Sequence, residues 1–459
     1  MQSKLNKNKI EYLLYHLNHH FKVHTGIRNK IIFDQPTQTS HRMIIFPLSS
    51  KGMDSIKYIK DVAILYPLTD TNSFYHFDDN NNLVFNDDLL KSAFYLLSGY
   101  QEIEQQPIDP YFRFSYKQSI QKKLNISTFP LVNEYFRIIA EGIEEFCNRN
   151  NIEFQKRNLW KDKNFGFLLT HDIDRVDKYS IKTVKLKVKQ IFGLSKSKLN
   201  KWKLSEQLAE NIVQLLKNKN PYWNFGWMKE VEKEFGLNSV WFFLPKRDPK
   251  KDAYFSFEED RIKTLVKDLK SYGDEIGLHA TYGSYNNNEI LKKDFNDVKK
   301  LIGVEPKGNR QHWLRFKYPE TLRLLEKIEI KYDSSWGFHD QIGWRNSYCF
   351  PFRPYDIEKD RIMDIWEFPL SIMDTTLFEY MNVGQPAAIK QVNTLIESVE
   401  KYNGLFTLLW HNSKFELENG ENLTDFYLYV LKRVTENNVL SFVPGKRISN
   451  NIDFLNEEE

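Results

Sequence analysis

The sequence predicts an α/β fold whose larger part is a distorted or incomplete (β/α) barrel, preceded by a smaller α+β N-terminal domain. From Phe165 onward, apolar runs of strand length alternate with segments of helical periodicity, which is typical of a parallel sheet covered by helices. Polar residues suited to chemistry follow several of these runs, at the strand ends where such barrels carry their active sites. The chain of 459 residues is also long enough for two domains.

The N-terminal domain is predicted to span residues 1–150, and we find no catalytic cluster in it. Apolar spacing predicts helices at 10–21, 89–100 and 131–148, and short buried strands at 43–47 and 62–66. The second helix is preceded by Asn86-Asp-Asp, which supplies a capping residue. The polar segment 149–164 marks the boundary, and the barrel is predicted to occupy residues 165–445.

Strands and helices alternate through the predicted barrel. The expected strands are 165–169, 239–244, 275–279, 306–310, 330–334, 364–368, 405–411 and 439–442. The expected helices lie within 183–216 and at 260–271, 288–302, 319–327, 386–401 and 422–436. Strands that largely alternate with helices in this way favour a parallel (β/α) barrel.

Composition excludes several classes of protein. The hydrophobic fraction of 41% can build a full core, which excludes a disordered chain, and the net charge of +4 gives no support for nucleic-acid binding. One lysine-rich stretch, 182–203, stands out. It fits a solvated helix and loop, or a contact with an anionic glycan carrier or membrane surface. The sequence does not set the oligomeric state.

Cysteine usage and hydropathy bear on location. Only Cys147 and Cys349 are present, far apart in sequence, so we expect no disulfide framework and a reducing compartment. No apolar run approaches the roughly 18 residues of a membrane span, and the N-terminal stretch does not resemble a signal peptide. These observations predict a cytoplasmic location without a membrane span.

The most informative stretch is Phe165-Gly-Phe-Leu-Leu-Thr-His-Asp-Ile-Asp-Arg175. Side chains two apart in an extended chain point to the same side, so Asp172 and Asp174 can converge on one cation or one reacting centre. His171 then points away, unless the strand has already turned. The structural alternative is a polar turn in which Asp174 caps the next helix.

Further polar residues follow the later strands, and a barrel would bring all of them to one mouth. They are Asp172, Asp174, His279, Arg310, His312, Glu367 and His411. Each alone also fits a structural role, such as a core histidine or a buried Arg–Glu pair. Their common position at the ends of successive strands favours a site.

Two carboxylates with one or two imidazoles suit a divalent metal, above all Zn²⁺, which accepts mixed nitrogen and oxygen ligands. Such a metal lowers the pKa of a water and polarises a carbonyl. A carboxylate outside the metal can act as base and a histidine as acid, with Arg310 holding the base ionised. Tryptophans and tyrosines in the same loops suit a carbohydrate substrate, although core packing also explains them.

Four motifs carry a family resemblance: Thr170-His-Asp-Ile-Asp174, Glu275-Ile-Gly-Leu-His279, Arg310-Gln-His-Trp-Leu-Arg315 and Leu408-Leu-Trp-His411. In this order they resemble the polysaccharide deacetylases of the nodulation type, carbohydrate esterase family 4. More narrowly, they look like a bacterial subgroup with an extra N-terminal domain of unknown function. The motifs cover residues 165–445.

The resemblance implies a role for each matched residue. Asp172 corresponds to the catalytic base, Arg310 to its supporting residue and His411 to the acid for the leaving amine, and Glu367 is a further catalytic candidate at the same strand ends. His279 corresponds to a metal ligand. The family's second aspartate would fall at Ile173, so Asp174 takes the metal role here, and Gly283 stands where the second histidine ligand belongs. We expect His312 as third ligand, with Ser284 or Tyr285 as alternatives.

The predicted function is therefore a metal-dependent deacetylase that hydrolyses an N-acetyl group on a sugar or glycan precursor, in surface polysaccharide metabolism. Two alternatives stay open. Because the second histidine is missing, the chain also fits a non-catalytic glycan-binding protein whose barrel has lost its deacetylase activity. It can also hydrolyse a non-sugar C–N bond, as the fold's relatives do.

Overall fold

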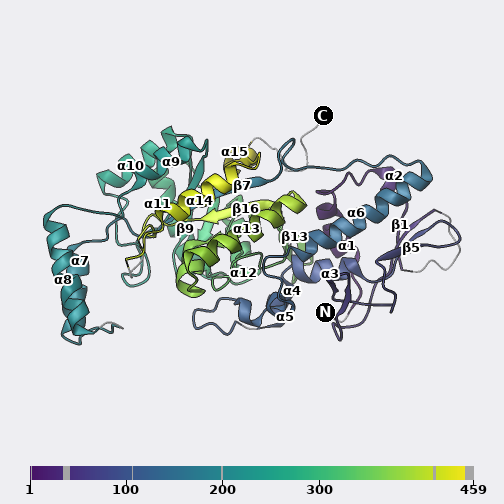
Figure 1. Cartoon of the computed structure of the whole chain (residues 1–459), viewed down its shortest axis with the longest axis horizontal. Helices are drawn as coiled ribbons and strands as arrows, with labels where there is room; N and C mark the ends of the chain where they lie inside the picture. The colour runs from purple at the N-terminus through teal and green to yellow at the C-terminus, as the bar shows by residue number, and fades with distance from the viewer. Residues whose placement is uncertain (2, 35–41, 106, 198–199, 417–419, 450–459) are drawn as a thin grey trace.

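The computed structural model describes residues 1, 3–34, 42–105, 107–197, 200–416 and 420–449. Figure 1 shows an elongated molecule, with helices α7 (Ile181–Ile191) and α8 (Lys201–Leu216) at one end and strands β1 (Ile31–Phe33) and β5 (Tyr75–Phe77) at the other. Within the described ranges, no helix combines the length and the apolar character that crossing a bilayer requires.

A parallel sheet forms the centre of the C-terminal part. Its strands follow one another in the order β14-β11-β10-β9-β8-β7-β16-β15, and β17 pairs with the start of β7. In sequence order the strands are β7 (Gly166–Ile173), β8 (Ser239–Phe243), β9 (Glu275–Ala280), β10 (Gly308–Gln311), β11 (Tyr332–Asp333), β14 (Trp366–Glu367), β15 (Ile372–Met373), β16 (Leu405–Leu409) and β17 (Leu440–Ser441). Neighbouring strands of this sheet pair in parallel throughout the described residues.

The sheet is a half-barrel of eight strands rather than a closed one. Its two outermost strands, β14 and β15, are each two residues long and are not paired with each other in the described part of the chain. The predicted incomplete α/β barrel agrees with this arrangement. Short outer strands limit the sheet edge that is left to pair with another chain.

Helices follow the strands as the periodicity predicts. The bounds of α10 (Asp260–Ser271) and α11 (Asn288–Ile302) match the prediction, and α12 (Glu320–Lys327), α13 (Gln385–Tyr402) and α14 (Thr424–Thr435) lie within two residues of it. Four helical elements of the described half-barrel lie outside the predicted helices. They are α9 (Phe225–Glu234), the short turn His312–Leu314, the π-helical turn Thr376–Tyr380, η3, and α15 (Pro444–Ser449).

The N-terminal part has its own small sheet, in the order β1-β2-β6-β5, with β2 (Ile44–Phe46) and β6 (Leu83–Phe85). A hairpin of β3 (Lys57–Ile59) and β4 (Val62–Ile64) is separate from it. Its helices are α1 (Lys7–Leu17), α2 (Thr25–Arg28), α3 (Leu89–Leu97), α4 (Tyr100–Glu104), α5 (Ile120–Leu124) and α6 (Leu131–Asn150). Asp88 caps α3, because its side chain accepts a hydrogen bond from the backbone N–H of Lys91.

The N-terminal part and the half-barrel share one continuous cluster of buried hydrophobic side chains. Trp336 of the half-barrel lies against Gly99, where a β-carbon would come within 2.5 Å of the indole ring. The buried guanidinium of Arg345 donates to Glu102 at 2.8 Å across the same boundary. The two parts are therefore packed as one body, and a separate N-terminal domain remains a prediction.

Candidate active site at the carboxyl ends of the strands

Strand β7 is longer than predicted, and its last residues carry the site. Thr170 to Ile173 stay extended because they pair with Val240 to Phe243 of β8. The imidazole of His171 points away from the cavity and lies between Trp410 O, 2.8 Å from Nδ1, and Glu232 Oε1, 3.0 Å from Nε2. Asp172 and Asp174 point to the other side, as the alternation of an extended chain requires.

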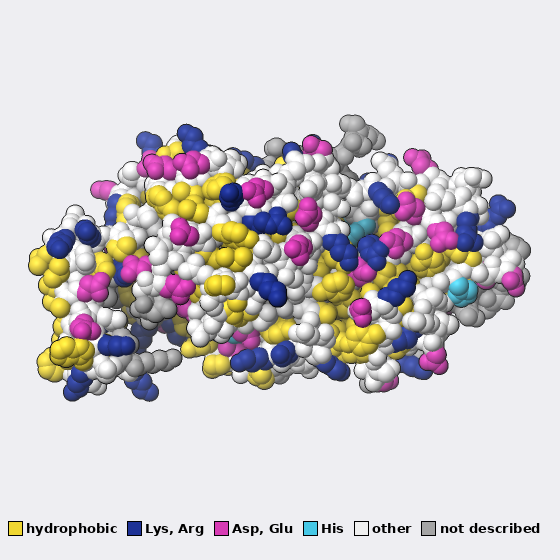
Figure 2. Space-filling model, viewed as in Figure 1, with side chains coloured by type: hydrophobic (Ala, Val, Ile, Leu, Met, Phe, Trp, Pro, Cys, Tyr) yellow, Lys and Arg dark blue, Asp and Glu magenta, His cyan; other side chains and the backbone are white. Residues whose placement is uncertain are grey.

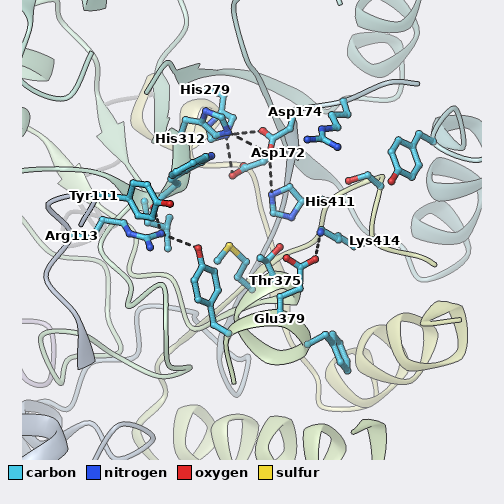
Figure 3. A pocket seen from close by; sticks show the side chains of 18 of the residues that line it. Tyr111, Arg113, Asp172, Asp174, His279, His312, Thr375, Glu379, His411 and Lys414 are labelled. Atoms are coloured by element: carbon cyan, nitrogen blue, oxygen red, sulfur yellow. Dashed lines mark hydrogen bonds and ion pairs between the residues drawn. The ribbon is translucent and has the colours of Figure 1, made fainter. Parts of the chain in front are cut away.

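A cavity of about 750 Å³ opens at this end of the sheet, and Figure 3 shows the side chains that point into it. Of the predicted residues, five line it: Asp172, Asp174, His279, His312 and His411. Tyr111 and Arg113 also line it, and both come from the N-terminal part. The wall of the cavity is thus built by both parts of the chain.

Asp174, His279 and His312 lie close enough to hold one metal ion, with a ligand atom of each within 4.8 Å of the others. His279 Nε2 lies 3.1 Å from Asp174 Oδ1 and 3.5 Å from Asp172 Oδ2. His312 Nε2 lies 3.6 Å from Asp174 Oδ2. The alternative ligands face elsewhere: the Ser284 hydroxyl donates to Thr281 O, and the Tyr285 ring covers the Arg315 guanidinium.

The donor set fits a cation. His279 Nδ1 lies 2.9 Å from the carbonyl oxygen of Arg310, which accepts its proton and leaves a lone pair on Nε2 facing two carboxylates. His279 Nε2, Asp174 Oδ1 and Asp172 Oδ1 are buried without a hydrogen-bond partner among the described residues. Buried acceptors in such a group repel one another unless positive charge lies between them.

The imidazole of His312 contacts Asp174 through Nε2, and the buried carboxylate of Asp252 lies 3.4 Å from its other nitrogen, Nδ1. A carboxylate behind an imidazole is the arrangement that orients histidine ligands in metal sites. Burial alone would lower the pKa of His312, yet the carboxylates of Asp174 and Asp252 raise it to about 9. Burial would raise the pKa of Asp174, but His312 and His279 hold it well below its ordinary value. The site thus stabilises positive charge, which a metal can supply in place of the proton.

His411 is positioned by Asp374, a residue that the sequence analysis missed. Asp374 Oδ1 lies 2.8 Å from His411 Nδ1, and Asp374 Oδ2 accepts the backbone N–H of His411 at 2.5 Å. His411 Nε2 points into the cavity, 3.8 Å from Asp174 Oδ2. Burial lowers the pKa of His411, but the adjacent Asp374 carboxylate raises it to about 9. Asp374 therefore favours the protonated form of the imidazole.

Arg310 and Glu367 are not among the residues that line the cavity, in contrast to the prediction. Both lie within strands, and their side chains turn into the packed interior. The Arg310 guanidinium donates to Thr170 Oγ1 at 3.2 Å and Ser334 Oγ at 3.0 Å. Glu367 accepts the backbone N–H of Trp336 at 2.9 Å, and burial followed by the nearby Asp333 raises its pKa well above the ordinary value.

Of the tryptophans expected at the mouth, Trp313 lines the cavity, while Trp336, Trp344, Trp366 and Trp410 are buried in the core. Arg113 holds the N-terminal loop against this wall: it donates to Trp313 O at 3.3 Å and to the Tyr380 hydroxyl at 3.2 Å. Its charge is paired with Asp109 at 3.1 Å. An aromatic wall of Trp313, Tyr111 and Tyr380 thus replaces the expected one.

A comparison with family models matches residues 2–148 to a family of unknown function, DUF7033. No curated protein matches. Among solved structures, the chain is similar to an inferred polysaccharide deacetylase from Mycobacterium smegmatis at 15% identity, covering 64% of this chain and 92% of that one, with a TM-score of 0.41.

An inferred polysaccharide deacetylase from Pseudomonas aeruginosa PAO1 is 11% identical, over 66% of this chain and 95% of that chain, with a TM-score of 0.42. The Puue allantoinase is 13% identical, over 63% of this chain and 91% of that chain, with a TM-score of 0.40.

Proposed function

We propose that this chain is a metal-dependent deacetylase that hydrolyses an N-acetyl group on a sugar or glycan precursor, in surface polysaccharide metabolism. One observation carries the proposal. Asp172, outside the three candidate ligands, and His411, oriented by Asp374, face the same cavity as Asp174, His279 and His312. Base, acid and cation donors in one cavity are the groups that amide hydrolysis requires.

Asp174, His279 and His312 would hold the metal. When bound, a divalent cation such as Zn²⁺ would polarise the amide carbonyl and lower the pKa of a water. The orientation of the ligands supports this assignment, because His279 is fixed by Arg310 O and His312 by Asp252.

Asp172 and His411 would move the protons. Asp172 is ready to accept one, since its Oδ1 has no hydrogen-bond partner among the described residues. His411 would donate its Nε2 proton to the departing amine, and Asp374 would hold the imidazole in place through Nδ1. Arg310, packed beneath the mouth against Thr170, would act on β7 rather than on the substrate.

The cavity is large enough for sugar units, since small-molecule sites occupy about 300–1,000 Å³. Trp313, Tyr111 and Tyr380 offer ring faces of the kind that pack against sugars.

The test measures metal content and acetate release on the same preparation. Protein purified without chelator is expected to hold close to one zinc or similar ion per chain and to release acetate from N-acetylated oligosaccharides. Removal of the metal by a chelator should stop release, and restoring the ion should recover it. Sugar binding without any acetate, at full metal occupancy, would instead indicate a non-catalytic glycan-binding protein.

The pH dependence tests the role of Asp374. In the unaltered protein the acid His411 has a pKa of about 9, so activity should fall as the pH rises through about 9. In Asp374→Asn the carboxylate that raises this pKa is gone, and the alkaline limb should move toward the ordinary histidine value of about 6.5 or below. A pH–rate profile of kcat records the shift. An unmoved alkaline limb would remove His411 from the role of acid.

A further inference from the structure

The helical hairpin of α7 and α8 projects from the half-barrel at one end of the molecule (Figure 1). Its base is tied to the body by Asn220, whose side chain donates to Val176 O and Asp177 Oδ1, both at 2.7 Å. The Tyr179 hydroxyl donates to Glu210 at 3.1 Å. Arg175, just before the hairpin, and Tyr222, just after it, both line the cavity. The hairpin therefore rises directly from the rim of the proposed active site.

Exposed hydrophobic side chains are concentrated on this hairpin. Nine of the nineteen exposed large hydrophobic residues among the described ones lie between positions 181 and 216. Three of them lie near the turn: Phe192 is 74% exposed, Leu194 78% and Trp202 72%. Leu216, at the other end of α8, is 81% exposed. A folded monomer rarely leaves such a group in water unless it contacts a partner or a membrane.

The same hairpin carries a strong local excess of positive charge. Residues 181–219 contain ten lysines and two glutamates, whereas the whole chain has a net charge of only +4. Lys185, Lys189, Lys196, Lys201 and Lys203 have exposed side chains. Figure 2 shows hydrophobic and basic side chains next to one another at this end of the molecule.

We propose that the α7–α8 hairpin docks this protein on the surface of an anionic lipid bilayer, with Phe192, Leu194 and Trp202 entering the interface. Lysines attract anionic headgroups, and long apolar and aromatic side chains between them bury in the boundary between headgroups and acyl chains. A second copy of the chain fits less well, because its own lysines would repel these. An acidic protein or a nucleic acid would pair with the lysines, but would not explain why apolar side chains are exposed among them.

A consequence, which rests on the proposed function, concerns the substrate. Because both ends of the hairpin lie at the cavity rim, docking would hold the cavity beside the lipid surface, where a sugar carried on a lipid anchor is presented. Vesicle binding is measured without turnover, so its result does not depend on whether the protein has deacetylase activity.

The experiment is cosedimentation of the full chain with vesicles of phosphatidylcholine alone and of phosphatidylcholine mixed with phosphatidylglycerol. The protein should sediment with the anionic vesicles, only weakly with the neutral ones, and less as salt screens the lysines. One variant replaces apolar residues (Phe192→Ser, Leu194→Ser and Trp202→Ser), and another reverses charge (Lys185→Glu, Lys189→Glu and Lys196→Glu). Since each lysine near the surface changes partitioning about fivefold, the second should lose binding by about a hundredfold or more.

Matched controls carry the same kinds of change elsewhere on the exposed surface. They are Tyr58→Ser with Ile108→Ser and Val304→Ser, and Lys267→Glu with Lys292→Glu and Lys293→Glu, all at exposed positions. These should sediment like the unaltered protein. Equal sedimentation with neutral and anionic vesicles, or hairpin variants that behave like the controls, would overturn the proposal. Loss with the lysine variant but not with the apolar one would overturn the entry of Phe192, Leu194 and Trp202 into the interface.

Discussion

Asp172→Asn is expected to lower kcat for acetate release by about 10²–10⁴-fold, the usual contribution of a general base. The amide is nearly the same size as the carboxylate but cannot accept the proton, and Asp172 is not one of the three candidate ligands. Metal content and the thermal unfolding midpoint should therefore stay close to those of the unaltered protein, which separates lost chemistry from lost structure.

Asp177→Asn is the matched control for this change. Asp177 lies in the loop that follows β7, pairs with Arg261 at 2.7 Å and does not line the cavity. Loss of an exposed ion pair costs at most about 1 kcal/mol of stability and should leave kcat intact. If Asp172→Asn kept most of its activity while the metal remained bound, another group would have to be the base.

His312→Ala is expected to weaken zinc binding by more than the roughly 10–100-fold that follows loss of a residue behind a ligand. The variant removes one of three candidate ligands, and the remaining pair, Asp174 and His279, would leave the ion open to chelators. Competition against a chromophoric chelator measures the zinc Kd directly, without recourse to activity.

Two further variants provide comparisons for the zinc Kd of His312→Ala. Asp252→Asn keeps the imidazole but removes the carboxylate behind it, so its zinc Kd should rise by about 10–100-fold. His76→Ala changes an exposed histidine of the N-terminal sheet and should leave the Kd unchanged. Equal Kd values for His312→Ala and His76→Ala would exclude His312 from the site.

The sequence predicts the half-barrel well because its periodicity is strong. Helices α10 and α11 have one apolar face and four or more buried residues each, so their bounds could be predicted to the residue. The strand predicted at 165–169 ends four residues before β7 does, because the polar residues Thr170, His171 and Asp172 have the appearance of a strand end. Pairing with β8 and, for Thr170, also with β16 keeps them extended, and both strands are far away in the sequence.

The sequence predicts only part of the site, because residues could be assigned to it only where a strand gives a clear pattern. Asp172, Asp174, His279, His312 and His411 follow regular strands, and their convergence follows from the fold. Asp374 follows β15, a strand of two residues, which is too short to give a periodic signal. Ser371-Ile-Met-Asp374 nevertheless has the same form as the other sites, an apolar run that ends in a carboxylate.

For other residues around the site, no local sequence pattern predicts where the side chain lies. Tyr111 and Arg113 belong to a loop of the N-terminal part, and only tertiary packing brings that loop to the cavity. Arg310 and Glu367 lie in strands β10 and β14, and their side chains hold neighbouring segments together, through Ser334 and through the backbone of Trp336.

The close fit between the N-terminal part and the half-barrel has a consequence for how such a chain can change over generations. At Gly343, a β-carbon would come within 1.8 Å of the carbonyl oxygen of Ser127, so the two backbones touch where no larger residue fits. Their buried side chains form one cluster. The half-barrel could not be exchanged for that of another protein without changes in the N-terminal part. Each half constrains the residues that the other can accept, and the two have to vary together.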